Sequence, residues 1–194
     1  MISKDFEKFN HNYPSVITVG TFDGIHLGHQ QLIKKVIQVS KAEQLKSIVL
    51  TFDPHPRSVL ESQKNIRLLN TFQEKENILT PFGLDFLVKK KFTKDFSKMS
   101  SVDFVKNILI DGLNLKYLVI GHDHHFGRNR TANITQLMEY SKLYDFKVTQ
   151  VDAFQLNDIS VSSTKIRNLI VDGNIDEANR FLGYNMFLSG IVVA

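Results

Sequence analysis

Residues 20–29, with the sequence GTFDGIHLGH, hold the side chains of this chain best suited to chemistry. An imidazole can donate a hydrogen bond to a phosphoryl oxygen whose charge grows during a transfer reaction, so His26 and His29 are candidate phosphate donors. The same spacing suits two metal ligands, or a structural pair in which one ring caps a helix and the other packs. The three glycines of the run favour phosphate, because a glycine-rich turn before a helix exposes unpaired N–H groups to an anion.

A second group of candidates lies near the end of the chain, where Ser162, Ser163 and Thr164 precede a predicted helix. Consecutive hydroxyl residues at a helix start cap it and can also bind an anion. Arg167 follows one turn later and offers a planar fork for phosphate oxygens. The alternative is an ordinary capped helix that carries a surface arginine.

Two further segments follow predicted strands. Two prolines stiffen the run Pro54-His55-Pro56, which is either a rigid turn or a ligand contact. Residues 122–125 (HDHH) place Asp123 among three histidines. Adjacent side chains rarely converge on one ion and no second ligand cluster is evident, so no metal is assigned and the role of these histidines stays open.

The elements that position these residues alternate between strand and helix. Apolar, β-branched runs predict strands over 15–20, 46–52, 84–88, 116–121 and 147–152, and helical spacing predicts helices over 28–40, 71–81, 101–111 and 131–143. Such alternation predicts an α/β fold with a five-stranded, mostly parallel sheet and helices on both faces. Ligands bind beyond the carboxyl ends of such strands, where the candidate segments fall.

The C-terminal part of the chain follows a different pattern. Two short helices are expected over 162–172 and 175–182, followed by a strand over 187–193. A final strand with no following partner indicates a truncated second domain. The alternative is a terminal strand added to the first sheet.

Composition narrows the functional classes. The chain has 194 residues, a net charge of +4 and no cysteine, which excludes disulfides, thiolate catalysis and iron–sulfur clusters. The modest positive charge fits an ordinary soluble surface, with a basic site for anionic substrates and a nucleic-acid groove as alternatives. No signal peptide or membrane-spanning run is visible, so the cytoplasm is the expected compartment.

The motifs together resemble a known family. The pattern G-x-F-D-x-x-H-x-G-H at residues 20–29 is that of the nucleotidylyltransferase superfamily. Nearly the whole chain resembles the N-terminal adenylyltransferase domain of the bacterial bifunctional riboflavin kinase/FMN adenylyltransferase (FAD synthetase) family. The further matches are PHPR at 54–57, RLL at 67–69 with EK at 74–75, the loop at 121–130, SSTKIR at 162–167 and LG at 182–183.

This resemblance implies a Rossmann-like nucleotidylyltransferase fold over residues 1–184, with 185–194 as the first strand of an otherwise absent riboflavin kinase domain. It implies an enzyme that transfers AMP from ATP to FMN, giving FAD and pyrophosphate, with Mg²⁺ bound mainly through ATP phosphates and no certain protein metal ligand. The small-molecule partners are ATP and FMN, with no nucleic acid and no membrane. Riboflavin kinase activity is not expected from this chain, and the sequence does not set the oligomeric state.

The implied site residues divide into three groups. His29, His26 and Arg167 are the expected catalytic residues, with His29 as the α-phosphate donor. The expected flavin contacts are Pro54, His55 and Pro56. The expected ATP contacts are Gly20, Phe22, Asp23, His26, Gly28, His29, Asp123, Ser162, Ser163, Thr164 and Arg167.

Two alternatives to this function stay open. One is another nucleotidylyltransferase, whose acceptor is pantetheine phosphate, nicotinamide mononucleotide or a glycerol phosphate. The other is a non-catalytic module that binds a flavin or nucleotide and releases no pyrophosphate.

Overall fold

A computed structural model describes residues 1–60, 66–122, 133–156, 159–190 and 192. The strands are β1 (Ile2–Asp5), β2 (Ser15–Val19), β3 (Lys46–Asp53), β4 (Phe86–Lys91), β5 (Leu115–Gly121), β6 (Lys147–Val151), β7 (Gln155–Leu156) and β8 (Ile159–Ser160). The helices are η1 (Phe6–Lys8), α1 (Leu27–Glu43), α2 (Pro56–Leu60), α3 (Phe72–Leu79), η2 (Thr80–Phe82), η3 (Phe96–Lys98), α4 (Ser101–Asp103), η4 (Phe104–Asp111), α5 (Ile134–Tyr144), α6 (Ser163–Val171) and α7 (Ile175–Leu182).

The central sheet has six strands rather than the expected five. Its order is β1-β4-β3-β2-β5-β6, and every pair is parallel. The added strand is β1, a short edge strand whose sequence ISKD has a single strongly apolar residue and therefore gives no strand signal. The chain runs outward from β2 to one side and then returns to β5 on the other side. The carboxyl ends of β2 and β5 therefore form the switch point at which such sheets bind ligands.

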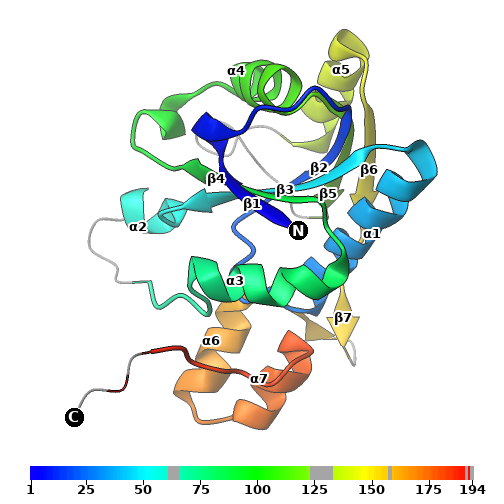
Figure 1. The fold of residues 1–194 in the computed structure, drawn as a ribbon. Coiled ribbons are helices and arrows are strands. Elements are labelled where there is room, and N and C mark those ends of the chain that lie inside the picture. The colour runs from blue at the N-terminus through cyan, green and yellow to red at the C-terminus, as the bar shows by residue number, and fades with distance from the viewer. Residues whose placement is uncertain (61–65, 123–132, 157–158, 191, 193–194) are drawn as a thin grey trace.

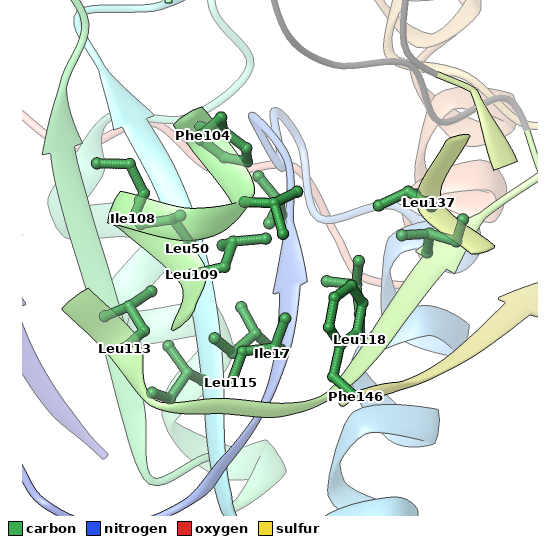
Figure 2. Close-up of a cluster of buried hydrophobic side chains, with 14 of the residues drawn as sticks. Ile17, Leu50, Phe104, Ile108, Leu109, Leu113, Leu115, Leu118, Leu137 and Phe146 are labelled. Carbon is green, nitrogen blue, oxygen red and sulfur yellow. The ribbon is translucent and has the colours of Figure 1, made fainter. Parts of the chain in front are cut away.

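Alternation along the strands divides the core into two layers. Ile17, Leu50 and Leu118 point to the face covered by η4 and α5, where they pack with residues such as Leu109 and Phe146 (Figure 2). Residues of the opposite parity, including Val16, Val49 and Val119, pack against α1 and α3 on the other face. All five residues of β2 are buried, as expected for a central strand covered on both sides.

A third apolar cluster lies away from the sheet. Ile166 of α6 packs with Phe181 and Leu182 of α7, and Leu69 from the segment before α3 joins them. Figure 1 shows this helix pair, in orange, beneath α3 at one end of the molecule. The pair therefore forms a small separate layer beside the β2–α1 connection.

Several element boundaries differ from expectation. The helix expected over 101–111 begins at Ser101 as α4, after the N-cap Ser100, and continues to Asp111 as the π-helix η4. The helix expected over 131–143 begins at Ile134, because Asn133 is extended and caps it by accepting from the Gln136 N–H. The short helix α2 and the antiparallel β7–β8 pair were not expected.

The expected terminal strand is not formed over residues 187–190, which have no regular secondary structure. A strand needs a neighbour for its ladder. The N–H of Ser189 donates instead to the Glu74 carboxylate, at 3.0 Å. In the described part of the chain, no helix has the length and apolar character needed to cross a membrane.

Candidate active site

A cleft of about 850 Å³ opens at the switch point of the sheet. Its walls come from the β2–α1 turn (residues 20–26), the ends of β3, β5 and β6, and the start of α6, which are far apart in sequence. Among its lining residues are Gly20, Phe22, Asp23, His26, Gly28, His29, His55, Pro56, Ser162, Ser163, Thr164 and Arg167. The cleft thus brings together candidates from all three regions that the sequence singled out and the structure describes.

The β2–α1 turn has an unusual backbone. Phe22, Gly24 and Ile25 have φ values of 48°, 83° and 36°, and only the second is a glycine. A side chain at Gly24 is excluded by space as well as by its φ, because a Cβ there would lie 2.5 Å from Leu69 Cδ1. Left-handed conformations at non-glycine residues cost about 1–3 kcal/mol each and persist only where the surroundings fix them.

Side chains from other elements hold the Thr21 carbonyl of this turn. Lys75 Nζ, on α3, donates to Thr21 O at 2.8 Å, and Thr51 Oγ1, on β3, donates to the same oxygen at 3.2 Å. Both donors are buried, with relative exposures of 6% and 0%. The carbonyl is therefore fixed from the interior of the protein.

The next carbonyls are held from the α6–α7 side. Ser163 Oγ donates to Asp23 O at 2.8 Å, and Tyr184 Oη donates to Gly24 O at 2.7 Å. Burial raises the pKa of Tyr184 to about 12, so its hydroxyl remains a donor at neutral pH. The strained turn is thus held by donors from four separate segments.

Asp23 links the turn to the α6 helix. Its side chain is 1% exposed; Oδ2 accepts from Arg167 Nη1 at 2.8 Å, and Oδ1 accepts from the Leu69 N–H at 2.9 Å. Arg167 Nη2 also contacts Thr164 Oγ1 at 3.3 Å. Both carboxylate oxygens are therefore engaged by the protein, and the guanidinium is held at the wall of the cleft.

The two histidines stack on each other, with ring centroids 3.7 Å apart and planes 17° apart. His26 is the N-cap of α1, because its Nδ1 accepts from the His29 N–H at 3.4 Å. His29 also meets the edge of the Phe22 ring at 5.2 Å. Stacked parallel rings do not direct their nitrogens toward a common ion, so the geometry does not favour the metal interpretation of this pair.

Burial strongly lowers the pKa of His29, and the nearby His26 and Lys75 lower it further. The ring is therefore neutral at physiological pH. Its Nδ1 is buried and has no hydrogen-bond partner in the structure. A neutral imidazole beside a cleft can accept a proton or donate one from its other nitrogen, which suits contact with a phosphate.

Positive potential in the cleft comes partly from two helix N-termini. The first turns of α1 and α6 both line it, and neither contains an acidic residue. Ser162 caps α6 by accepting from the Lys165 N–H at 3.3 Å. Since the single carboxylate of the turn, Asp23, is paired with Arg167, the unpaired N–H groups of both helices favour an anion.

Aromatic side chains form another wall. Phe52, Phe92 and Phe96 all line the cleft, with ring centroids 5.6–5.9 Å apart in edge or tilted contacts. His55 and Pro56 line it nearby. Burial lowers the pKa of His55, an effect that Asp23 opposes. This wall offers a planar ring an apolar surface.

Two expected site residues, Asp123 and Pro54, are not among the residues that line the cleft in the described part of the chain. Asp123 and most of the 121–130 loop fall outside the described residues, although Gly121 and His122 line the cleft. Pro54 is exposed and is not a lining residue, unlike His55 and Pro56. Among the described residues, no cluster of three or more His, Asp or Glu side chains could hold a metal ion.

Sequence reasoning missed the residues that hold the turn from outside, namely Lys75, Thr51 and Tyr184. Lys75 occurs in a motif of the family resemblance, but no pattern in the sequence shows that a lysine is buried against a particular carbonyl. The aromatic wall was also missed, because nothing distinguishes Phe52 or Phe92 from the other phenylalanines of the chain.

A doubly wound parallel sheet, with two helix N-termini and two imidazoles at its switch point, defines this chain as an α/β protein with a Rossmann-like fold and a cleft suited to an anion. The chain belongs to the FAD synthetase family, whose family model matches residues 8–165.

Named relatives agree with this assignment. A bifunctional riboflavin kinase/FMN adenylyltransferase of Buchnera aphidicola subsp. Schizaphis graminum is 35% identical over 190 residues, which is 97% of this chain and 60% of the relative. A FAD synthetase of Listeria monocytogenes is 33% identical over 179 residues, covering 92% of this chain and 72% of the relative. The chain thus spans about 60% of the length of the Buchnera relative.

A solved structure has the same fold. It is the crystal structure of a protein from Streptococcus pneumoniae described as a macrolide-efflux protein. It superposes with a TM-score of 0.84 at 27% identity, covering 96% of this chain and 61% of that one.

Proposed function

We propose that this chain is an FMN adenylyltransferase, which transfers AMP from ATP to the phosphate of FMN and releases pyrophosphate. The observation that carries the proposal is the shared cleft, in which the two histidines, Arg167 and two helix N-termini line one end and an aromatic wall lines another. One end suits a triphosphate and the other a flavin ring. Membership of the FAD synthetase family supports this pairing.

The reaction needs no general base from the protein. A phosphate oxygen of FMN, already an anion, attacks the α-phosphorus of ATP; the new P–O bond forms as the bond to the β-phosphate oxygen breaks, and pyrophosphate leaves. The protein must hold the two anions in line and stabilise the charge that develops on the α-phosphate.

In this proposal His29 donates to the α-phosphate in the transition state. A preorganised donor at developing charge contributes about 3–4 kcal/mol, whereas an exposed helix N-terminus contributes about 0.3–1 kcal/mol. His26 contacts the triphosphate or the leaving group. Its Nδ1 already accepts from the His29 N–H, so the neutral ring carries its proton on Nε2.

The remaining ATP contacts are proposed for α6 and the turn. Ser162, Thr164 and Arg167 hold the β- and γ-phosphates through their side chains, and Ser163, whose hydroxyl donates to Asp23 O, contributes its N–H. Asp23 acts by orienting Arg167, since both of its oxygens are engaged. Mg²⁺ enters with ATP as part of the substrate, held by phosphate oxygens. Asp123 is proposed as an ATP contact from the family resemblance.

The flavin is proposed to lie along the aromatic wall. His55 and Pro56 are placed to contact it, and the Phe52, Phe92 and Phe96 rings offer edges and faces to the isoalloxazine. Pro54 acts by shaping this segment rather than by lining the cleft.

We also propose that residues 1–184 form the adenylyltransferase domain and that 185–194 begin the next unit of the longer relatives. On this proposal the 194-residue chain makes no FMN from riboflavin and ATP. Detection of FMN in that assay contradicts it.

Pyrophosphate release with ATP and each candidate acceptor tests the function. FMN is expected to support turnover, while pantetheine phosphate, nicotinamide mononucleotide and glycerol phosphate do not. Turnover with one of those acceptors and not FMN overturns the proposal in favour of another nucleotidylyltransferase. Binding of FMN and ATP without pyrophosphate release overturns it in favour of a non-catalytic module.

A further inference from the structure

Lys75 is a buried lysine that faces the back of the β2–α1 turn. Its relative exposure is 6%, and it is not among the residues that line the cleft. It lies on α3, whose start is fixed by a capping box between Thr71 and Glu74. A lysine is rarely this buried unless it has a partner, and here the partner is the Thr21 carbonyl, 2.8 Å from Nζ.

This contact sets the direction of a peptide group that borders the cleft. The peptide between Thr21 and Phe22 is trans, so its C=O and N–H point in opposite directions. Lys75 and Thr51 hold the carbonyl from the interior, and both residues of the peptide line the cleft. The N–H of Phe22 is therefore directed toward the cleft side.

We propose that Lys75 is a positioning residue for the ATP triphosphate: it anchors the Thr21 carbonyl and thereby aims the Phe22 N–H at the phosphates. The inference rests on the proposed function in taking ATP as the ligand. It goes further by assigning a role to a side chain that does not itself reach the cleft wall.

The charges around Lys75 are compatible with this role. Burial lowers the pKa of Lys75, and the carboxylates of Asp23 and Asp53 oppose that shift. An ammonium group and a neutral amine both donate hydrogen bonds, so the anchor to Thr21 survives in either state. When charged, Lys75 and Arg167 are balanced by the carboxylates of Asp23 and Asp53, so the proposed role rests on the hydrogen bond to Thr21 and not on net charge.

The left-handed φ of Phe22 explains why an anchor is needed. This conformation is unfavourable for a residue with a side chain, so a turn released at Thr21 relaxes toward ordinary φ values. The orientation of the Phe22 N–H is then no longer fixed, and ATP loses a preorganised hydrogen-bond donor. This loss affects bound substrate and transition state alike, so it falls on affinity rather than on kcat.

The test compares three variants with the unaltered chain by direct titration with a non-hydrolysable ATP analogue and by steady-state kinetics. Lys75→Met keeps a buried aliphatic side chain of similar length and removes the Nζ hydrogen-bond donor. Lys75→Arg keeps a donor, and Thr51→Val removes the second donor to the same carbonyl without changing charge. Lys147→Met is the matched control, because Lys147 forms an exposed ion pair with Glu43 at the opposite end of the strands.

We expect Lys75→Met to weaken analogue binding about tenfold, equivalent to about 1.4 kcal/mol, with kcat changed less than threefold. Lys75→Arg binds within threefold of the unaltered chain, Thr51→Val binds two- to threefold more weakly, and Lys147→Met binds normally. Unchanged binding by a folded Lys75→Met variant overturns the inference. If that variant does not fold, normal binding by Thr51→Val overturns it.

The unaltered chain separates this inference from the proposed function. If it binds the analogue but releases no pyrophosphate with FMN, the proposed function fails and the Lys75 comparison still decides the inference. If it does not bind the analogue, both are overturned.

Discussion

His29 is the residue on which the proposed chemistry depends most. The ring is neutral, stacked on His26, and beside the cleft at the helix start. We expect His29→Ala to lower kcat for FAD formation about 10²–10³-fold, by analogy with the loss of one charge-stabilising donor. Circular dichroism and thermal unfolding should show an intact fold. Turnover equal to that of the unaltered chain contradicts this role.

His26 combines a structural and a chemical role, and two substitutions separate them. His26→Ala removes the cap of α1 and is expected to cost about 1 kcal/mol of unfolding free energy, whereas His26→Asn keeps a capping acceptor and most of that stability. Both variants lose the imidazole, so their FAD-forming activity should fall equally. The measurements are urea unfolding and pyrophosphate release. Recovery of activity in His26→Asn indicates that capping is the whole function of this residue.

The sequence predicted the residues that line the cleft better than the residues that support them. The turn, both histidines, the α6 hydroxyls and Arg167 were predicted, and the structure brings them to one cleft. The pairing of Arg167 with Asp23 was not predicted, because the two residues are 144 positions apart and each alone looked like a ligand contact. Long-range pairing of this kind depends on the packing of α6 and α7, which a local pattern does not reveal.

At the scale of elements, the Arg167–Asp23 ion pair and the hydrogen bond from Ser163 to Asp23 O connect α6 to the β2–α1 turn. Arg167→Ala leaves the Asp23 carboxylate, 1% exposed, without its cation. Removing one partner of a buried pair typically costs about 3–5 kcal/mol, so this variant should unfold at much lower urea concentration.

The double variant Arg167→Ala/Asp23→Asn is the control for this prediction, since it removes both charges. It should regain much of the stability and little of the ATP affinity. If the single variant is as stable as the unaltered chain, the ion pair does not hold α6 to the turn.

The prediction of helices and strands succeeded where the apolar pattern was strong and failed where the element was short. The five core strands and α1 were expected, since buried β-branched runs and an apolar helix face leave clear patterns. β1 has four residues, and it pairs only with β4, whose paired residues lie 84 positions later in the chain (Ile2 with Phe86). The helix expected over 101–111 is confirmed, and the spacing of its apolar residues did not show that Phe104–Asp111 is π-helical.

At the scale of the whole molecule, Asp85 ties β3 to the segment that leads into β4. Burial alone would raise the pKa of Asp85, but hydrogen bonds from Ser47 and the Lys46 ammonium outweigh it and hold this pKa below its ordinary value. A carboxylate whose pKa is lower in the folded state stabilises the fold above the unfolded pKa of about 4, and this contribution is lost as pH falls below that value.

We therefore expect Asp85→Asn to lower the unfolding free energy at pH 7 by about 1–2 kcal/mol, after allowance for partial exposure. The difference in unfolding free energy between this variant and the unaltered chain should become smaller as the pH falls from 5 to 3. Urea titrations at several pH values measure it. Asp95→Asn, at an exposed i,i+3 pair, is the control and should change little. A gap that stays constant with pH contradicts the assignment.

The backbone of the β2–α1 turn limits how far its motif can be transplanted. The recognisable motif has ten residues, and three residues at its centre have positive φ values. Hydrogen bonds from α3, β3, α6 and the segment after α7 to carbonyls of the turn stabilise this backbone. Grafted alone onto another scaffold, the decapeptide would be expected to relax and lose the phosphate contacts proposed for it. A transplanted site would therefore need the decapeptide together with the four distant side chains that donate to its carbonyls. Transfer of the contiguous motif alone would keep the sequence signature and lose the conformation of the turn.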